Sequence, residues 1–244
     1  MNADWSGFSF IVTNLARFIR PDEITFSGVN STMPMLACLM AKRAYDFDFV
    51  YINVAGGVDP EPSHIPISSS DPVLAEQSAS IFANEDFYDL CTRGRMDLTF
   101  LGAAQIDGEG RANNSAIGPW HKPKVRLPGG GGGAVMLPTA RRACTWRTEH
   151  STRTLVERLD FVTAAGGFFG VVTPIAVFTK RDGRLALQSW HPESSLEEVR
   201  SRTGFAFDAT GAGPTPPPTA REIAALRSLD PDSRFERDAA VRLR

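Results

Sequence analysis

A strand–helix–strand alternation near the start of the chain restricts its fold more than any other feature. Residues 23–28 form a short β-rich run that ends in a glycine, and residues 33–45 read as a helix. Residues 47–54 are again rich in aromatic and β-branched residues, which favour a strand. Elements that alternate in this way over about 30 residues are typical of the βαβ unit of a parallel sheet. The pattern predicts an α/β fold with an open, mainly parallel sheet flanked by helices.

The alternation continues along the rest of the chain. Further helices are predicted over 8–19, 84–93, 194–202 and 219–228, and further strands over 97–101, 123–127, 142–147 and 159–164. Asp182-Gly183 between the runs 174–179 and 185–190 predicts a β-hairpin, because Asp-Gly tolerates the positive φ of a tight turn.

Two stretches bear on the domain organisation and on membrane association. Residues 161–179 carry no charge, but three glycines and a proline favour two buried strands over a membrane span. We expect residues 1–244 to form a single domain, in which 210–244 supply a Pro-rich linker, a last helix and a tail.

The composition argues against several functional classes. With 26 Lys and Arg against 28 Asp and Glu, the net charge of −2 lacks the basic excess of a nucleic-acid binder. Three widely spaced cysteines without a CxxC pair indicate reduced thiols, and no signal peptide is visible, so we expect a cytoplasmic protein. The four histidines lie outside metal-binding spacings, and we expect no metal site; they are His64, His121, His150 and His191.

Five consecutive glycines, Gly129 to Gly133, are the strongest local anomaly. Without side chains, the backbone can approach a ligand closely, and several N–H groups can converge on one oxygen as in an oxyanion hole. The run follows a predicted strand, and α/β proteins place ligand loops beyond the carboxyl ends of strands. A mobile surface loop is the alternative, and the run alone does not decide between the two.

Several segments, taken in order, resemble the class I CoA-transferase family, most closely the β subunit of the glutaconate type. The matching stretches are 41–45, 102–114, 117–126, 149–150, 155–163, 191–192 and 203–205, with the glycine run at the expected distance. The resemblance implies the family's open α/β fold. It also implies an α-type partner subunit of similar fold, with the active site between the two subunits and an α2β2 heterotetramer as the assembly.

One position departs from the family pattern. In the transferases, a glutamate that follows the strand after the Ala-Lys-Arg motif attacks the acyl-CoA, and the resemblance places Val54 at that position. Valine offers no nucleophile, and a transferase needs a carboxylate to carry the acyl group. The nearest acid downstream, Asp59, lies beyond two glycines. We therefore expect this chain to support a reaction other than CoA transfer.

The resemblance implies which reaction a family member without the transferase glutamate can still catalyse. A site that polarises a thioester carbonyl suits the loss of CO2 from a glutaconyl-type thioester, since the electrons of the broken bond pass into that carbonyl. Relatives without transferase activity include a heteromeric 3-methylglutaconyl-CoA decarboxylase of isovaleryl-CoA biosynthesis and a ring-opening hydrolase of steroid degradation. We expect the B-type chain of such a decarboxylase, which converts 3-methylglutaconyl-CoA to 3-methylcrotonyl-CoA and CO2 without a cofactor. A CoA-transferase β chain, a C–C hydrolase and a non-catalytic scaffold chain stay open as alternatives.

The expected site residues follow from the same reasoning. Gly131 and Gly132 are the candidate backbone oxyanion donors, and Val54 marks the position of the missing glutamate. The candidate substrate-binding residues are Gly28, Asn53, Gly130 and Gly133. For Gly28 and Asn53, a structural role as strand end or cap is an equal alternative.

Overall fold

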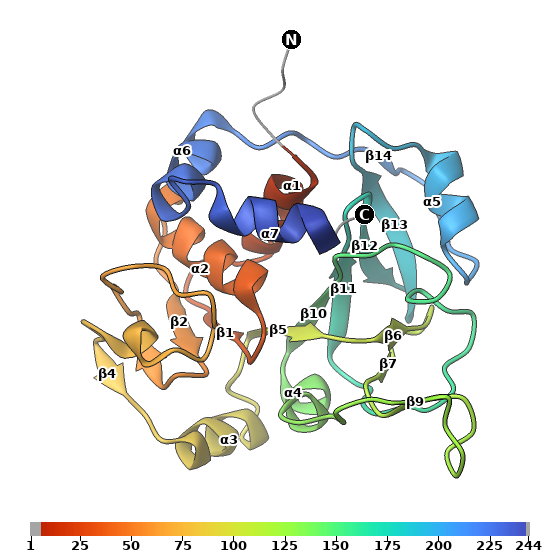
Figure 1. Cartoon of the computed structure of the whole chain (residues 1–244), viewed down its shortest axis with the longest axis horizontal. Coiled ribbons are helices and arrows are strands. Elements are labelled where there is room, and N and C mark those ends of the chain that lie inside the picture. The colour runs from red at the N-terminus through yellow and green to blue at the C-terminus, as the bar shows by residue number, and fades with distance from the viewer. Residues whose placement is uncertain (1–5, 243–244) are drawn as a thin grey trace.

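The described part of the chain, residues 6–242 of the computed structural model, is organised around one ten-stranded sheet (Figure 1). The strand order is β14-β13-β12-β11-β10-β5-β1-β2-β3-β4. The five central strands, β11, β10, β5, β1 and β2, run parallel, and antiparallel strands extend the sheet on both sides. This arrangement confirms the expected open, mainly parallel α/β sheet.

Seven α-helices and a short 3-10 helix accompany the sheet in this described range. The helices are α1 (Gly7–Ala16), α2 (Thr32–Ala44), η1 (Pro72–Ala75), α3 (Asn84–Thr92), α4 (Gly133–Thr139), α5 (Leu196–Arg202), α6 (Ala220–Leu229) and α7 (Arg234–Arg242). The strands of the main sheet are β1 (Ile24–Ser27), β2 (Val50–Asn53), β3 (Gly57–Val58), β4 (Ser80–Ile81), β5 (Leu98–Gly102), β10 (Arg142–Trp146), β11 (Phe168–Val172), β12 (Ala176–Arg181), β13 (Arg184–Trp190) and β14 (Gly213–Pro214). Two small hairpins pair β6 (Gln105–Ile106) with β7 (Ala112–Asn113), and β8 (Ala116–Ile117) with β9 (Val125–Arg126).

Successive side chains of the central strands point to opposite faces of the sheet, so apolar side chains are buried on both faces. On β5, Leu98 and Phe100 belong to a core with α1, α2, α6 and α7, which gather on one side of the molecule in Figure 1. On β1 and β2, Phe26 and Ile52 belong to a second core with residues of α3 and α4. Period-two alternation in strands therefore buries both faces, as a parallel sheet requires.

Most of the predicted elements are present. The first strand–helix–strand unit is β1-α2-β2, with β1 and β2 parallel and paired in register from Ile24 with Val50 to Ser27 with Asn53. Asp182 and Gly183 adopt φ angles of 51° and 82° between β12 and β13, which confirms the predicted hairpin. The uncharged stretch does hold two strands, β11 and the first part of β12. No helix within residues 6–242 is long and apolar enough to cross a bilayer.

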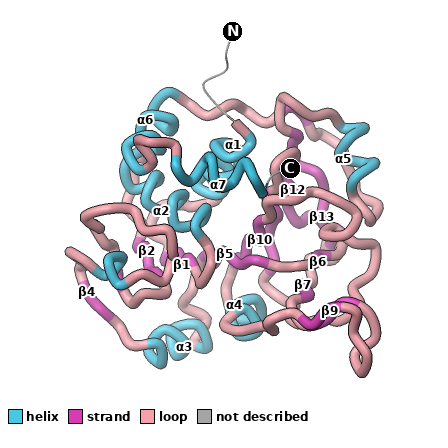
Figure 2. The backbone as a smooth tube through the Cα atoms, viewed as in Figure 1, coloured by secondary structure: helices cyan, strands magenta, loops and turns pink. Residues whose placement is uncertain are grey.

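The structure differs from the predicted elements in three places. The strand expected over 159–164 is a loop that touches the β6–β7 hairpin through a single bridge, Ala112 to Ala164. The Pro-rich stretch after Thr210 is not only a linker, because β14 within it pairs with β13. Residues 133–139 form a helix that was not expected. Figure 2 shows how much of the chain around the sheet is loop.

Candidate functional site

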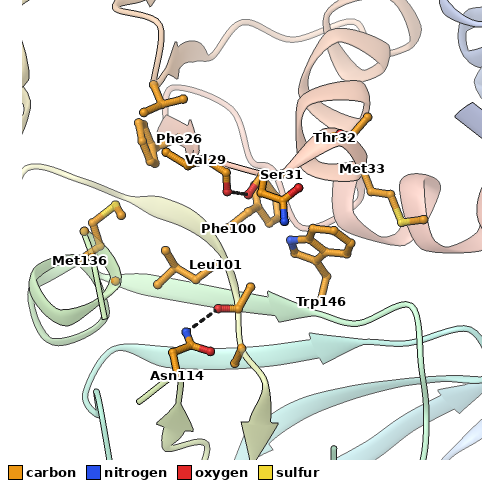
Figure 3. Close-up of a pocket in the computed structure, with 18 of the residues that line it drawn as sticks. Phe26, Val29, Ser31, Thr32, Met33, Phe100, Leu101, Asn114, Met136 and Trp146 are labelled. Atoms are coloured by element: carbon orange, nitrogen blue, oxygen red, sulfur yellow. Dashed lines mark hydrogen bonds between the residues drawn. The ribbon is translucent and has the colours of Figure 1, made fainter. Parts of the chain in front are cut away.

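A cavity of about 760 Å³ opens at the carboxyl ends of four neighbouring parallel strands. Gly28 directly follows β1, Val54 follows β2, Gly102 ends β5 and Arg147 follows β10, and all four residues line the cavity. The order of strands in the sheet brings these positions together, although they are far apart in the sequence. Figure 3 shows the wall formed by Phe26, Phe100, Leu101, Met136 and Trp146. Ligands of α/β proteins bind at this edge of the sheet.

The glycine run forms one side of the cavity, and all five glycines line it. It is fixed at its start, where the Gly129 amide donates to Asn114 O at 2.7 Å, and it turns into α4, where the Gly133 amide donates to Gly130 O at 2.9 Å. The segment beyond α4 is held too: the Gly167 amide donates to Leu137 O at 2.6 Å. The run is therefore an anchored turn in this structure, which argues against a mobile loop.

The amides of the three middle glycines, Gly130 to Gly132, donate to no other atom of residues 6–242. The backbone at Gly131 has φ of +48°, which an L side chain rarely adopts. A Cβ on Gly130 would stand 2.9 Å from the Ala134 Cβ, and one on Gly132 would stand 2.8 Å from the Met136 Cε. The left-handed turn requires glycine at Gly131, and the close neighbours favour glycine at Gly130 and Gly132. The three unpaired donors belong to residues that line the cavity.

Val54 lies at the apolar end of the same cavity. Its half-buried side chain packs against the core that contains Phe26, Phe87 and Met136. The Phe26 and Phe87 rings stack with centroids 4.2 Å apart, so aromatic surface surrounds this end. A charged group placed here loses much of its hydration, which is costly unless a partner compensates.

The structure gives the neighbouring Asn53 a structural role. Its side chain is fully buried, its amide donates to Leu74 O at 2.8 Å, and its Oδ1 accepts from the Ala55 amide at 2.9 Å. Asn53 is not among the residues that line the cavity. The structure therefore does not bring it together with the other candidates, because successive side chains of a strand point to opposite faces. Gly28 does line the cavity, and its carbonyl accepts a hydrogen bond from Ser69.

Two charged residues lie on the cavity wall within residues 6–242. Arg147 is the single cation among the described residues of this wall, and burial lowers the pKa of its guanidinium. Its Nη1 donates to Ala103 O at 2.9 Å, whereas its Nε has no hydrogen-bond partner. Asp238, exposed on α7, is the single carboxylate of the same wall. Neither residue was singled out from the sequence. The carboxyl end of the predicted strand 142–147 could have indicated Arg147, whereas no local signal places the C-terminal helix over the cavity.

The histidines lie outside the cavity. His64 and His121 are exposed, whereas His150 and His191 are buried. His150 lies within 2.8 Å and 3.0 Å of the Thr173 and Thr203 hydroxyls, and His191 within 3.0 Å of both the Thr215 hydroxyl and Thr173 O. We call these two histidines with Thr173, Thr203 and Thr215 the histidine cluster. Burial lowers the pKa of His150 to about 3 and that of His191 to about 4.

All three cysteines, Cys38, Cys91 and Cys144, are buried free thiols, which agrees with the reduced thiols expected from the sequence. Burial raises the pKa of Cys91 to about 11. No cluster of three or more His, Cys, Asp or Glu side chains in residues 6–242 could hold a metal ion.

Comparison with known proteins identifies the family of this chain. Residues 11–181 match the Coenzyme A transferase family. The B subunit of 3-oxoadipate CoA-transferase from Pseudomonas knackmussii is 30% identical over 235 residues, which cover 88% of this chain and 89% of the relative. The B subunit of glutaconate CoA-transferase from Acidaminococcus fermentans is 28% identical over 246 residues, 91% of each chain.

Solved structures agree with the sequence matches. The crystal structure of the decarboxylase AibA/AibB superposes with a TM-score of 0.89 at 30% identity, covering 95% of this chain and 98% of the other. These matches over most of the chain, in sequence and in structure, show that this protein belongs to the coenzyme A transferase family.

Proposed function

We propose that this chain is the B-type chain of a heteromeric acyl-CoA decarboxylase that acts on a glutaconyl-type thioester. The observation that carries the proposal is Val54, an inert aliphatic side chain on the wall of a cavity that also presents three unpaired glycine amides. Similarity to the AibA/AibB decarboxylase supports it. The resemblance that aligns Val54 with the transferase glutamate supports it as well.

In the proposed reaction, the thioester oxygen accepts hydrogen bonds from the Gly131 and Gly132 amides. The bond between the terminal carboxylate carbon and Cγ breaks, and CO2 leaves. The electron pair moves through the C=C bond onto the thioester oxygen and gives a dienolate, and a proton that originates from water is then added to Cγ. One oxyanion donor is worth about 3–4 kcal/mol of barrier, because it strengthens as charge develops on the oxygen.

The apolar end around Val54 favours the same step. A glutamate there would repel the carboxylate that is to be lost. Valine removes that charge and leaves the departing carboxylate poorly hydrated, whereas neutral CO2 has little hydration to lose.

The proposal includes a partner and excludes a cofactor. The relatives are named as B subunits, and we propose an α-type partner of the same family in an α2β2 heterotetramer. The reaction requires no metal, biotin or other organic cofactor, because the thioester itself accepts the electrons. 3-Methylglutaconyl-CoA is the proposed substrate and 3-methylcrotonyl-CoA the product, which would serve isovaleryl-CoA biosynthesis.

The test is a product assay on the complex of both subunits. Incubation with 3-methylglutaconyl-CoA should release CO2 and 3-methylcrotonyl-CoA in equal amounts, as followed by mass spectrometry. A folded complex that releases neither product would reject the proposal. Native mass spectrometry of the same sample would give the number of each subunit.

CoA transfer is the second candidate, because the curated relatives at 30% and 28% identity are named as transferases. Such a reaction needs a carboxylate within reach of the thioester, and Asp238 is the acid that this chain brings to the cavity within its described residues. Exchange of labelled CoA into a free carboxylic acid, with borohydride trapping of an acyl intermediate on a carboxylate, would support it against decarboxylation.

A further inference from the structure

A tyrosine hydroxyl lies close to Gly132, one of the glycines with an unpaired amide. Tyr88 belongs to α3, which packs against α4, and its side chain lines the cavity. A Cβ placed on Gly132 would stand 3.0 Å from the Tyr88 Oη and 3.8 Å from its Cε1. The missing side chain of Gly132 is what allows the phenol to approach the backbone of the glycine run so closely.

The Tyr88 hydroxyl has no hydrogen-bond partner within residues 6–242, whereas the hydroxyls of Ser31 and Thr32, which also line the cavity, are both occupied. Ser31 Oγ donates to Val29 O at 3.2 Å, and Thr32 Oγ1 donates to Ile67 O at 3.3 Å. Tyr88 is 39% exposed, and its ring packs edge-on against Phe87 with centroids 5.4 Å apart. The ring is therefore held by a neighbour, and its O–H is free for a ligand.

From this juxtaposition we infer that Tyr88 is a catalytic residue, a side-chain hydrogen-bond donor to the thioester oxygen. Because the Tyr88 hydroxyl approaches Gly132 closely, we expect an oxygen bound by the Gly131 and Gly132 amides to accept from this hydroxyl as well. A phenol is a neutral donor, so it strengthens its hydrogen bond as negative charge develops without placing a counter-charge near the leaving carboxylate. The inference rests on the proposed use of the glycine amides, and it holds for any reaction that builds charge on that oxygen.

The first experiment compares Tyr88→Phe with wild type in the two-subunit complex, using 3-methylglutaconyl-CoA. We expect kcat to fall about 100-fold, the lower value for loss of one oxyanion donor, with KM within about twofold. Tyr45→Phe is the matched control, because it removes a hydroxyl that bonds to Glu222 and lies outside the cavity. Its kcat should equal that of wild type. A Tyr88→Phe kcat within about threefold of wild type would overturn the inference.

The second experiment needs no turnover. 3-Methylcrotonyl-CoA with a ¹³C-labelled thioester carbonyl is bound to the complex, and its C=O stretch is measured by difference infrared spectroscopy. Wild type should lower the stretching frequency, Tyr88→Phe should restore part of it, and 3,5-difluorotyrosine at position 88, a stronger donor, should lower it further. A stretch that is the same in all three proteins would overturn the inference even if Tyr88→Phe folds poorly.

The two experiments separate this inference from the proposed function. If wild type releases no CO2 but the carbonyl stretch still depends on the group at position 88, the donor role stands and the decarboxylase proposal fails. If CO2 is released at equal rates by wild type and Tyr88→Phe, the decarboxylase stands and the donor role fails.

Discussion

The glycine run and the histidine cluster differ in whether their polar groups have hydrogen-bond partners. In the histidine cluster, both ring nitrogens of His150 and of His191 lie within 3.0 Å of a hydroxyl or a carbonyl. In the glycine run, three successive amides have no partner within the described residues, and they face a cavity. Partners for buried polar groups stabilise a fold, whereas donors left unpaired beside a cavity are available to a ligand. The contrast predicts that substitutions in the histidine cluster alter stability and that substitutions in the glycine run alter turnover.

The largest effect is expected from Val54→Glu, which adds a charge to the cavity wall. Two like charges about 4 Å apart near a protein surface repel by about 4 kcal/mol, so the substrate carboxylate should bind more weakly and kcat/KM for decarboxylation should fall about 1,000-fold. Val54→Gln has the same size without the charge and should lose much less. Steady-state rates of CO2 release compare the two variants. Equal losses would show that shape rather than charge matters at this position.

The next effect concerns the Gly132 amide. Gly132 has φ of −61°, which suits proline, so Gly132→Pro removes the N–H at a compatible backbone angle. We expect kcat to fall by about 100- to 1,000-fold. Gly132→Ala adds the same Cβ next to Met136 and Tyr88 but retains the donor, so its loss should be clearly smaller. If alanine costs as much as proline, crowding explains the effect and the amide is not a donor.

The histidine cluster should determine how stability depends on pH. The unfolded chain binds protons at its histidines below about pH 6.5, whereas burial keeps the pKa of His150 at about 3 and that of His191 at about 4. The stabilisation is therefore complete above about pH 6.5 and is lost as the pH falls towards these lower values. Each histidine should lower the free energy of unfolding by about 2 kcal/mol between pH 6.5 and pH 5.

Urea unfolding at several pH values measures this dependence. His150→Gln retains an amide that can hydrogen bond but does not titrate, so the slope against pH should decrease by close to one proton. The slope, rather than the absolute stability, is the informative quantity, since the substitution also perturbs packing. An unchanged slope would mean that His150 is not buried in the neutral form.

The smallest effect is expected from Asp238→Asn. If the complex is a decarboxylase, this exposed carboxylate takes no part in the reaction, and the rate of CO2 release should remain within about twofold of wild type. As a transferase that uses Asp238 to carry the acyl group, it would lose CoA exchange altogether. The same protein preparation in both assays thus distinguishes the two candidate functions.

Much of the fold could be predicted from sequence because the central elements have strong local signals. The β1-α2-β2 unit and the β12–β13 hairpin combine clear periodicity with turn residues at their boundaries. The helix α4 could not be predicted, since it begins with glycine and contains Pro138, both poor helix formers. Its buried Met136 and Leu137 hold it in place, and such tertiary contacts leave no local pattern.

The candidate site could be predicted only in part, for a related reason. The glycine run and Val54 stand out as anomalies in the sequence, and the structure places both on one cavity. Tyr88 looks like any aromatic residue of an amphipathic helix, and only its distance from Gly132 distinguishes it. For Asn53 the sequence left a structural role open, and the hydrogen bonds of its side chain to Leu74 O and to the Ala55 amide fit that alternative.

The anchoring of the glycine run at Asn114 and beyond α4 has a consequence for ligand binding. Glycine has more backbone freedom than any other residue, and fixing one residue costs about 1–2 kcal/mol of conformational entropy. Here hydrogen bonds within the chain set the turn, so that entropy is lost when the chain folds and not when a ligand binds. A glycine run that would be highly flexible in a free peptide is thus preorganised, and ligand binding does not have to supply the free energy of ordering it.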